Sequence, residues 1–263
     1  MAAATRPRMG IFGLTGCAGD QLALLDCEDE LLEIVERVDV RDFLMASSAN
    51  DDTGPLDLAL VEGAVASRRD EQALRRIRKR SRLVVALGTC AVWGGVAAMD
   101  RFADRGLLLR EIYGEAGAGY DSLPVRALHE VVAVDCALPG CPVEKHELLS
   151  ALASFLRGDP PLVPQYPVCT ECRMRETVCL LLRDGAVCCG PLTAAGCRAR
   201  CPALGVPCAG CRGPSRDANY PAALALFEAR GIPRAELERK LRTFAPAASL
   251  AAAPSALGDG GAA

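Results

Sequence analysis

Cysteine density between residues 169 and 211 is the feature that most constrains how this chain can fold. The stretch carries nine of the chain's 14 cysteines: Cys169, Cys172, Cys179, Cys188, Cys189, Cys197, Cys201, Cys208 and Cys211. The residues between them are rich in Gly, Pro and Arg, with one short apolar run at 178–182. A segment of this kind buries too little apolar surface to hold one conformation. Bonds from thiolates to metal can supply the missing stability, so we expect the stretch to fold around metal.

Iron–sulfur clusters, zinc sites and disulfides compete for these cysteines. Zinc ribbons favour two C-x-x-C pairs about 15–20 residues apart, whereas the two pairs that bracket this stretch are much further apart, with five cysteines between them. The chain's two histidines, His129 and His146, lie outside the stretch, which argues against mixed Cys/His zinc sites. Disulfides need an oxidising compartment, and the first residues lack the apolar core of a signal peptide.

When Cys189 is set aside, the remaining eight cysteines are separated by steps of 3, 7, 9, 9, 4, 7 and 3 positions. Eight thiolates are enough to hold two four-cysteine clusters. The spacing therefore favours two iron–sulfur clusters. A zinc-bound module and a disulfide framework are the alternatives.

The rest of the chain has the composition of a folded protein. Of its 263 residues 51% are hydrophobic, and the net charge of −3 gives no reason to expect nucleic acid as a partner. The basic segment 68–82 contains Leu74 and Ile77, which indicates the solvated face of a surface helix or, alternatively, a docking patch. No run of about 18 apolar residues occurs, so we expect no membrane span. With no export signal, the prediction is a cytoplasmic protein whose thiols stay reduced.

Apolar strands alternate with helical patterns over the first 158 residues. Strands are expected at 9–14, 40–45, 56–61, 83–87 and 131–134, helices at 21–37, 70–80 and 144–156, and a glycine-rich loop at 106–124. Such alternation predicts an α/β domain with a doubly wound, mostly parallel sheet.

Composition divides the chain into four segments. Residues 1–158 are expected to form the α/β domain, 159–215 a small, irregular cysteine-rich domain, 216–245 two C-terminal helices at 221–230 and 233–244, and 246–263 a disordered tail. The proline-rich stretch 159–167 is a stiff connector. The last segment is rich in Ala, Gly, Pro and Ser and has little to bury.

Three cysteines of the first domain follow predicted strands. Cys17, Cys90 and Cys141 each stand just past an apolar strand and beside glycines. Because the carboxyl ends of parallel strands share one edge of a sheet, the fold would bring these thiols together. Glycine-rich backbone can also offer N–H groups to the sulfides of a cluster. The pattern predicts a cluster site, with three ordinary buried cysteines as the alternative.

Several ordered motifs run along the chain: GLTGC at 13–17, VEG at 61–63, GTCA at 88–91 with GG at 94–95, LPGCP at 138–142, PVCxxC at 167–172, and GPxxxxGCxxxCP at 190–202. These motifs resemble the small subunit of cytosolic nickel–iron hydrogenases, which shares its first-domain fold with the complex I subunit of about 20 kDa. The resemblance covers residues 8 to about 215. Complex I-type subunits lack the second cysteine domain.

The resemblance implies a flavodoxin-like first domain with a proximal cluster and a second domain with medial and distal clusters, three [4Fe–4S] clusters in all. By motif, the proximal ligands are Cys17, Cys90 and Cys141, the distal ligands Cys169, Cys172, Cys179 and Cys188, and the medial ligands Cys197, Cys201, Cys208 and Cys211. The family's nickel–iron centre is in a separate large subunit. The chain is thus expected to be the non-catalytic, electron-transfer subunit of an oxidoreductase acting on hydrogen, which passes electrons to a flavin or further iron–sulfur subunit.

One position departs from the family pattern. The family has C-x-x-C in the first loop, where this chain has CAGD at 17–20. A carboxylate can ligate iron as a harder donor than thiolate, so Asp20 is expected to fill the fourth position. The alternatives are a three-iron or degenerate cluster, and an aspartate that merely caps a helix. Cys27, Cys136 and Cys189 fall outside the ligand pattern and are expected to lie in the core.

Two other functions stay open. The first is a stand-alone iron–sulfur electron-transfer or redox-sensing protein without hydrogenase activity, which the change at Asp20 keeps in play. The second is a zinc-bound assembly module.

Overall fold

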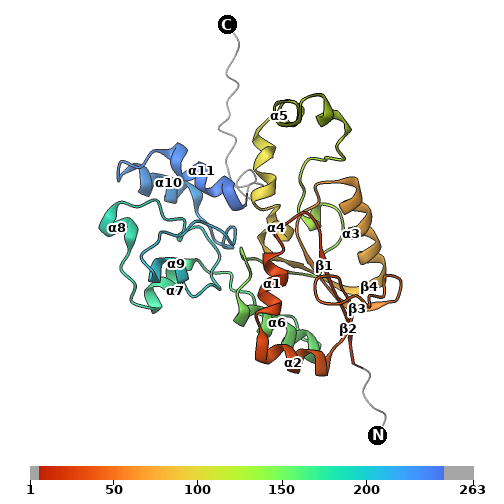
Figure 1. The fold of residues 1–263 in the computed structure, drawn as a ribbon. Helices are drawn as coiled ribbons and strands as arrows, with labels where there is room; N and C mark the ends of the chain where they lie inside the picture. Colours follow the sequence, from red (N-terminus) through yellow and green to blue (C-terminus); the bar gives the residue numbers. More distant parts are fainter. Residues whose placement is uncertain (1–5, 246–263) are drawn as a thin grey trace. The chain divides into compact units, whose positions relative to one another are not determined.

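The computed structural model describes residues 6–245 and divides into two compact units, Met1–Pro164 and Gln165–Ala263 (Figure 1). The expected tail at 246–263 lies outside the described residues. Within residues 6–245 no helix has the length and apolar character needed to cross a membrane.

A parallel sheet of five strands in the order β2-β1-β3-β4-β5 forms the centre of the first unit. The strands are β1 (Arg8–Gly13), β2 (Asp39–Phe43), β3 (Leu56–Glu62), β4 (Ser81–Leu87) and β5 (Cys136–Leu138). The chain adds β2 on one side of β1 and the later strands on the other, so the sheet is doubly wound. The central strands β3 and β4 are almost continuously buried, as expected for strands covered on both faces. The predicted α/β class is confirmed.

Two separate apolar cores cover the two faces of the sheet. Alternate residues of the strands point to opposite sides, so Leu58 and Leu60 enter one core while Ala59 and Val61 enter the other. Figure 1 shows α1 (Gly19–Leu25), α2 (Glu28–Arg37) and α6 (Lys145–Arg157) on the first face and α3 (Arg68–Arg80) on the second. The short helix α4 (Gly88–Trp93) and the 3-10 turns η1 (Val96–Phe102) and η3 (Leu128–Glu130) complete the second side.

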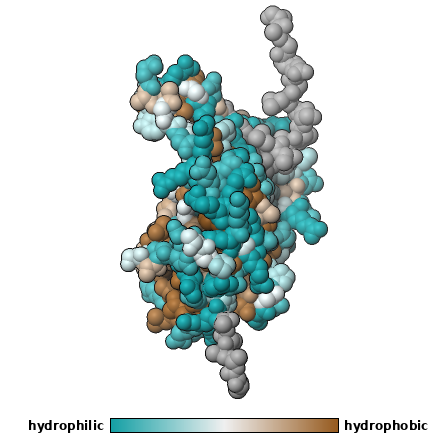
Figure 2. Space-filling model, turned by 90° about the vertical axis from the view of Figure 1, so that its right-hand side faces the viewer, coloured by the Kyte–Doolittle hydropathy of each residue, from teal (hydrophilic) through white to brown (hydrophobic). Residues whose placement is uncertain are grey.

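Helix α3 is a surface helix, as its sequence indicates. The Ser67 hydroxyl caps it by accepting the Asp70 N–H, and Leu74 and Ile77 are its buried residues. Its arginines are mostly exposed, and the face of the molecule that carries α3 is largely hydrophilic (Figure 2). Arg78 and Arg80 are the exceptions. The Arg78 guanidinium pairs with the Asp135 carboxylate at 2.5 Å, and that of Arg80 pairs with the Asp42 carboxylate at 2.6 Å.

The single helix expected at 21–37 is instead two helices, α1 and α2, that break at Asp26 and Cys27. The Cys27 side chain is fully buried and its thiol donates to the Ala23 carbonyl. The break lets α2 begin with three acidic residues, which a helix N-terminus favours.

The strand expected at 131–134 is wrong, since the fifth strand is β5 at Cys136–Leu138. Asp135 starts this pairing: its N–H donates to the Val84 carbonyl at 2.9 Å, and its carboxylate accepts the Val84 N–H at 2.7 Å. Val131, Val132 and Val134 are partly buried against the second core without joining the sheet.

The loop expected at 106–124 contains two helical segments, α5 (Arg105–Tyr113) and η2 (Gly114–Gly119). The Asp104 carboxylate caps α5 by accepting the Leu107 N–H. Of the glycines that suggested a loop, Gly114, Gly117 and Gly119 belong to η2, whereas Gly106 lies in the first turn of α5. No side chain of α5 is buried in the described part of the chain.

The second unit is built from short helices around a small apolar core. They are α7 (Val168–Met174), α8 (Leu180–Asp184), α9 (Arg200–Ala203), α10 (Tyr220–Glu228) and α11 (Arg234–Phe244). Val168 and Leu181 from the cysteine-rich stretch share this core with Phe227 and Leu237 from the last two helices. The C-terminal helices therefore supply apolar surface that the cysteine-rich stretch lacks.

Candidate iron–sulfur cluster sites

Cys17, Cys90 and Cys141 lie at the carboxyl edge of the sheet, after β1, at the start of α4 and after β5. Burial raises the pKa of the Cys90 thiol to about 11, and the charges of Cys141, Asp20 and Cys17 add to this rise. The four groups are thus near enough for their charges to interact. Cys17 and Cys141 are exposed and Cys90 is half-buried, so the thiols reach the surface and are not three ordinary core cysteines.

Glycines leave room beside these sulfurs. Gly95 has a φ of 59°, and a Cβ there would stand 2.6 Å from the Cys90 sulfur. Gly88, with a φ of 80°, leaves room for the Asp20 carboxylate, which a Cβ at this position would overlap. Space next to clustered thiols is what a bound cluster needs for its own sulfide atoms.

Asp20 is held in place by backbone. It is the second residue of α1 and only 5% exposed, and its Oδ1 accepts the Val143 N–H at 2.7 Å. Burial raises the pKa of this carboxyl to about 7, and the charge of Glu62 adds to the rise while the Val143 N–H opposes it. Asp20 does not cap α1 through a side-chain hydrogen bond, because Ala18 occupies the cap position; it is the acidic residue of the first turn.

Glu62 is a second buried carboxylate at this edge, and sequence reasoning treated it only as part of a motif. It ends β3, is 2% exposed, and its Oε2 accepts the N–H and the side-chain amide of Gln21. Its Oε1 has no hydrogen-bond partner among residues 6–245. Its charge raises the pKa values of Cys90 and Cys141. A charged residue directly after the apolar run 58–61 is the signal that could have identified it.

In the second unit Cys169, Cys172, Cys179 and Cys188 converge. Burial is the main cause that raises the pKa of Cys169 to about 12, and the charges of the other three cysteines add to the rise. A Cβ on Gly190 would stand 3.3 Å from the Cys169 sulfur and 3.5 Å from the Cys188 sulfur. Cys169 and Cys172 lie on α7, while Cys179 precedes α8. The structure thus brings together the four cysteines predicted as one ligand set.

The remaining predicted ligand set consists of two pairs, Cys197 with Cys201 and Cys208 with Cys211. Arg198 and Ala199 have left-handed φ values of 53° and 48°. Burial raises the pKa of the Cys197 thiol, and hydrogen bonds from the N–H groups of Arg200 and Ala199 oppose this rise. Cys201 follows in α9.

Cys208 and Cys211 form the other pair. Burial raises the pKa of Cys208, the Gly210 N–H opposes the rise, and the charge of Cys211 adds to it. The Cys208 N–H also donates to the Cys188 sulfur at 3.3 Å, so the two ligand sets adjoin.

No three Cys, His, Asp or Glu side chains of residues 6–245 lie close enough to hold one metal ion together. The ligands of a four-iron cluster stand further apart, because the cluster's own irons and sulfides lie between them. The cysteines outside both sets behave as expected: Cys27 and Cys189 are fully buried, and Cys136 is half-buried against the first core.

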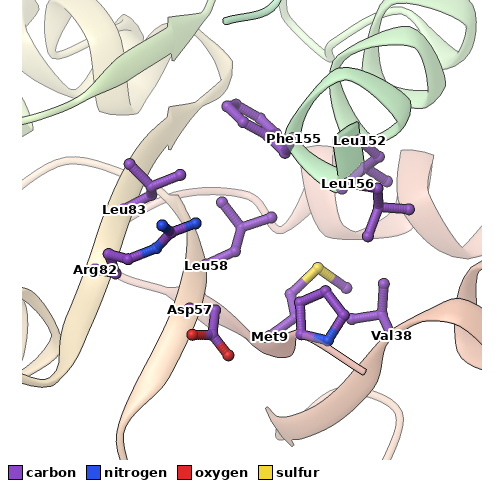
Figure 3. Close-up of a pocket in the computed structure, with 10 residues that line it drawn as sticks. Met9, Val38, Asp57, Leu58, Arg82, Leu83, Leu152, Phe155 and Leu156 are labelled. Carbon is purple, nitrogen blue, oxygen red and sulfur yellow. The ribbon is translucent and has the colours of Figure 1, made fainter. Parts of the chain in front are cut away.

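A small apolar hollow lies at the amino-terminal half of the strands, away from the edge that carries the three cysteines. Figure 3 shows Met9, Leu58 and Leu83 from the sheet facing Leu152 and Phe155 of α6. Asp57, which also lines the hollow, forms an ion pair with Arg8. The hollow brings no thiol together with another group.

Comparisons with known proteins agree with this arrangement. Residues 17–155 match the family described as NADH ubiquinone oxidoreductase, 20 Kd subunit. The Sulfhydrogenase 2 subunit delta of Pyrococcus furiosus is 40% identical over 238 residues, which are 90% of this chain and 99% of that protein. One subunit of the F420-non-reducing hydrogenase vhu of Methanocaldococcus jannaschii is 30% identical over 78% of this chain and 81% of that protein.

Solved structures show the same fold. A chain of the NAD+-reducing [NiFe]-hydrogenase in the H2-reduced state is similar with a TM-score of 0.54 and 29% identity, over 61% of this chain and 96% of that one. The actinobacterial-type NiFe-hydrogenase from Ralstonia eutropha is similar in fold, with a TM-score of 0.59 and 18% identity over 97% of this chain and 93% of that chain. The chain therefore belongs to the family of the NADH ubiquinone oxidoreductase 20 kDa subunit, and its relatives include subunits of hydrogenases.

Proposed function

We propose that this chain is the electron-transfer small subunit of a nickel–iron hydrogenase, which relays electrons between the nickel–iron site of a large subunit and an acceptor-reducing subunit. The observation that carries the proposal is the convergence of Cys17, Cys90 and Cys141 at one edge of the sheet, in a chain that matches a hydrogenase subunit over nearly its whole length. We propose a cytoplasmic location for the protein, because such sites need thiols that stay reduced.

Three iron–sulfur clusters are proposed, each of which takes up and releases one electron at a time when bound. Cys17, Asp20, Cys90 and Cys141 would hold the proximal cluster, Cys169, Cys172, Cys179 and Cys188 the distal one, and Cys197, Cys201, Cys208 and Cys211 the medial one. The chain's own part is to aim these donors, to offer N–H groups to the sulfurs and to limit the access of water. The thiols around Gly190 and the backbone N–H groups at Cys197 fit that task.

Asp20 is proposed as the fourth proximal ligand. It is close enough to Cys90 and Cys141 for its charge to raise the pKa values of both thiols. The Val143 N–H fixes Oδ1, so the protein itself orients the carboxylate. A harder oxygen donor would change the potential of the site without removing the cluster.

Exposed apolar side chains surround the proximal edge and support an interface with a large subunit. Leu44 is 81% exposed directly after β2, Leu22 projects from α1, and Val96 and Met99 follow α4. These residues belong to the segments that carry or adjoin the three cysteines. Burial of such a surface is typical of subunits that stay together permanently.

A hollow in the second unit supports contact with the acceptor-reducing subunit, proposed to be a flavin or iron–sulfur protein. Residues on both sides of Cys179 and directly after Cys201 line it, including Val178, Arg175 and Arg183. Cys179 and Cys201 are themselves exposed. A lining that combines apolar side chains with arginines has the composition of a protein contact surface.

The experiment is anaerobic purification from the native source, followed by metal and sulfide analysis and a hydrogen-dependent dye-reduction assay. We expect iron, acid-labile sulfide and a co-purifying nickel subunit. Stoichiometric zinc without sulfide would end the proposal in favour of the zinc-bound module. Iron and sulfide in a protein that repeatedly purifies without a nickel subunit would favour the stand-alone electron-transfer or redox-sensing protein.

A further inference from the structure

Two oppositely charged side chains are buried in the second unit beside the loop that carries Cys197. Arg212 is 1% exposed and is the largest fully buried side chain among the described residues. Glu171 is 9% exposed. Neither belongs to a proposed ligand set, and buried charges are costly enough that each calls for a specific explanation.

Glu171 connects the two ligand sets. It lies on α7 between Cys169 and Cys172. Its Oε1 accepts the Gly196 N–H at 2.9 Å and its Oε2 accepts the Ala199 N–H at 3.0 Å. These two N–H groups flank Cys197, whose sulfur is 4.0 Å from Oε2. The carboxylate therefore fixes the Cys197 loop and places a negative charge directly beside its thiol.

Arg212 approaches the same loop from the other pair of cysteines. It follows Cys211 in the chain, and its Nε donates to the carbonyls of Ala194 at 3.2 Å and Ala195 at 2.8 Å. These carbonyls directly precede Gly196. The guanidinium thus ties the loop of Cys211 to the loop of Cys197.

The two charges act on Cys197 with opposite sign. The Glu171 carboxylate is negative, and its Oε2 is 4.0 Å from the Cys197 sulfur. The Arg212 guanidinium is positive and is held against the carbonyls that precede Gly196. Both side chains are shielded from water and salt, so their fields are weakly screened. The same fields would act on any redox group that Cys197 binds.

We propose that Glu171 and Arg212 are positioning residues that set the reduction potential of the cluster held by Cys197, Cys201, Cys208 and Cys211 in opposite directions. Reduction adds one negative charge to a cluster, so the buried carboxylate disfavours it and lowers the potential. The buried guanidinium favours reduction and raises the potential. The inference rests on the proposed function, because it needs these four cysteines to be cluster ligands.

The test uses EPR-monitored redox titration of the anaerobic complex. Glu171→Gln and Arg212→Gln remove one buried charge each, and Arg212→Lys keeps the charge but changes the donor geometry. Glu176→Gln and Arg198→Gln are the matched controls, since both remove a charge from an exposed side chain of the same unit. The EPR signal of this cluster is assigned with the variant Cys201→Ser, which should alter that signal and leave the others unchanged.

Glu171→Gln should raise the midpoint potential and Arg212→Gln should lower it. Each should change the reduced-to-oxidised ratio at fixed potential by about tenfold, which is about 59 mV for one electron. Arg212→Lys and the two exposed controls should stay within about threefold of the parent. A purely structural role predicts instead that the buried substitutions reduce iron content or shift the potential without regard to charge sign.

The iron and sulfide content of the parent protein distinguishes a failure of the proposed function from a failure of the inference about Glu171 and Arg212. A parent without iron–sulfur clusters removes the proposed function itself. A parent with intact clusters, and buried variants that shift in the same direction or no further than the controls, overturns the inference alone. If Arg212→Gln loses iron, Glu171→Gln must still raise the potential and Arg212→Lys must still match the parent, and failure of either overturns the inference.

Discussion

Single carboxylates and thiols determine what the proximal edge can bind. Asp20 stands where the family pattern has a second cysteine, and it is buried, oriented by the Val143 N–H and close to three thiols. A carboxylate held this way is a preorganised donor. Its neighbour Glu62 is a second buried carboxylate, and its charge adds to the rise in the pKa of Asp20.

Asp20→Cys is expected to retain a four-iron proximal cluster with a shifted reduction potential and a changed EPR signal, because thiolate is the softer and more electron-donating ligand. Asp20→Ala is expected to convert the site toward a three-iron form or to lose the cluster, with a sharp fall in hydrogen-dependent electron transfer. EPR titration and iron analysis check both variants.

Asp26→Ala serves as the control for these changes, since Asp26 ends the same helix and is exposed. If Asp20→Cys and Asp20→Ala both show the parental proximal signal and potential, Asp20 is not a ligand.

Sequence reasoning located the thiols more successfully than the buried charges. Cys17, Cys90 and Cys141 could be placed together because parallel strands end at one edge. Glu171 and Arg212 were missed, because each reads as an ordinary polar residue between cysteines, and their burial depends on the way the Cys197 loop folds back. Such contacts between distant residues leave no periodic signal.

At the scale of elements, the helices α10 and α11 are part of the second unit's only sizeable apolar cluster among the described residues. Phe227 is fully buried in it, next to Val168 of α7 and Leu192 of the cysteine-rich stretch. The cysteine loops therefore depend on these helices as well as on metal.

Phe227→Ala should destabilise the second unit by about 3–5 kcal/mol, the usual cost of removing a buried phenylalanine. Thermal unfolding should show the loss, and the protein should retain less iron per chain. Leu226→Ala changes the neighbouring side chain, which is 39% exposed, and should have a much smaller effect. Equal effects of the two substitutions would show that α10 does not support the cluster loops.

Elements with long apolar runs were predictable, and those fixed by polar contacts were not. β3 and β4 are nearly continuous apolar strands and were found close to their true limits. The fifth strand was misplaced because β-branched residues precede it, while its register depends on the hydrogen bonds between Asp135 and Val84. The break at Cys27 has no proline or glycine to announce it.

For the whole molecule, the two units depend on metal to different degrees. The first has an apolar core on each face of its sheet, whereas the second has one small core and two proposed ligand sets. Where metal binding supplies part of the free energy of folding, that part is lost when the metal is removed.

Removal of iron should therefore unfold the second unit before the first. Hydrogen exchange should show that amides of β3 and β4 stay protected in the iron-depleted protein, while those of α7 to α9 exchange rapidly. Parallel loss of protection in both units, or none in either, would contradict this difference.

Electron relay is the central claim, and the most direct measurement is the response of this chain's clusters to hydrogen in the purified complex. We expect hydrogen to bleach the visible iron–sulfur absorption and to produce reduced-cluster EPR signals, and we expect Cys90→Ser to block reduction of the second unit's clusters while nickel content stays unchanged. A complex that contains nickel and iron–sulfur clusters, but whose clusters in this chain stay oxidised under hydrogen, would contradict the account.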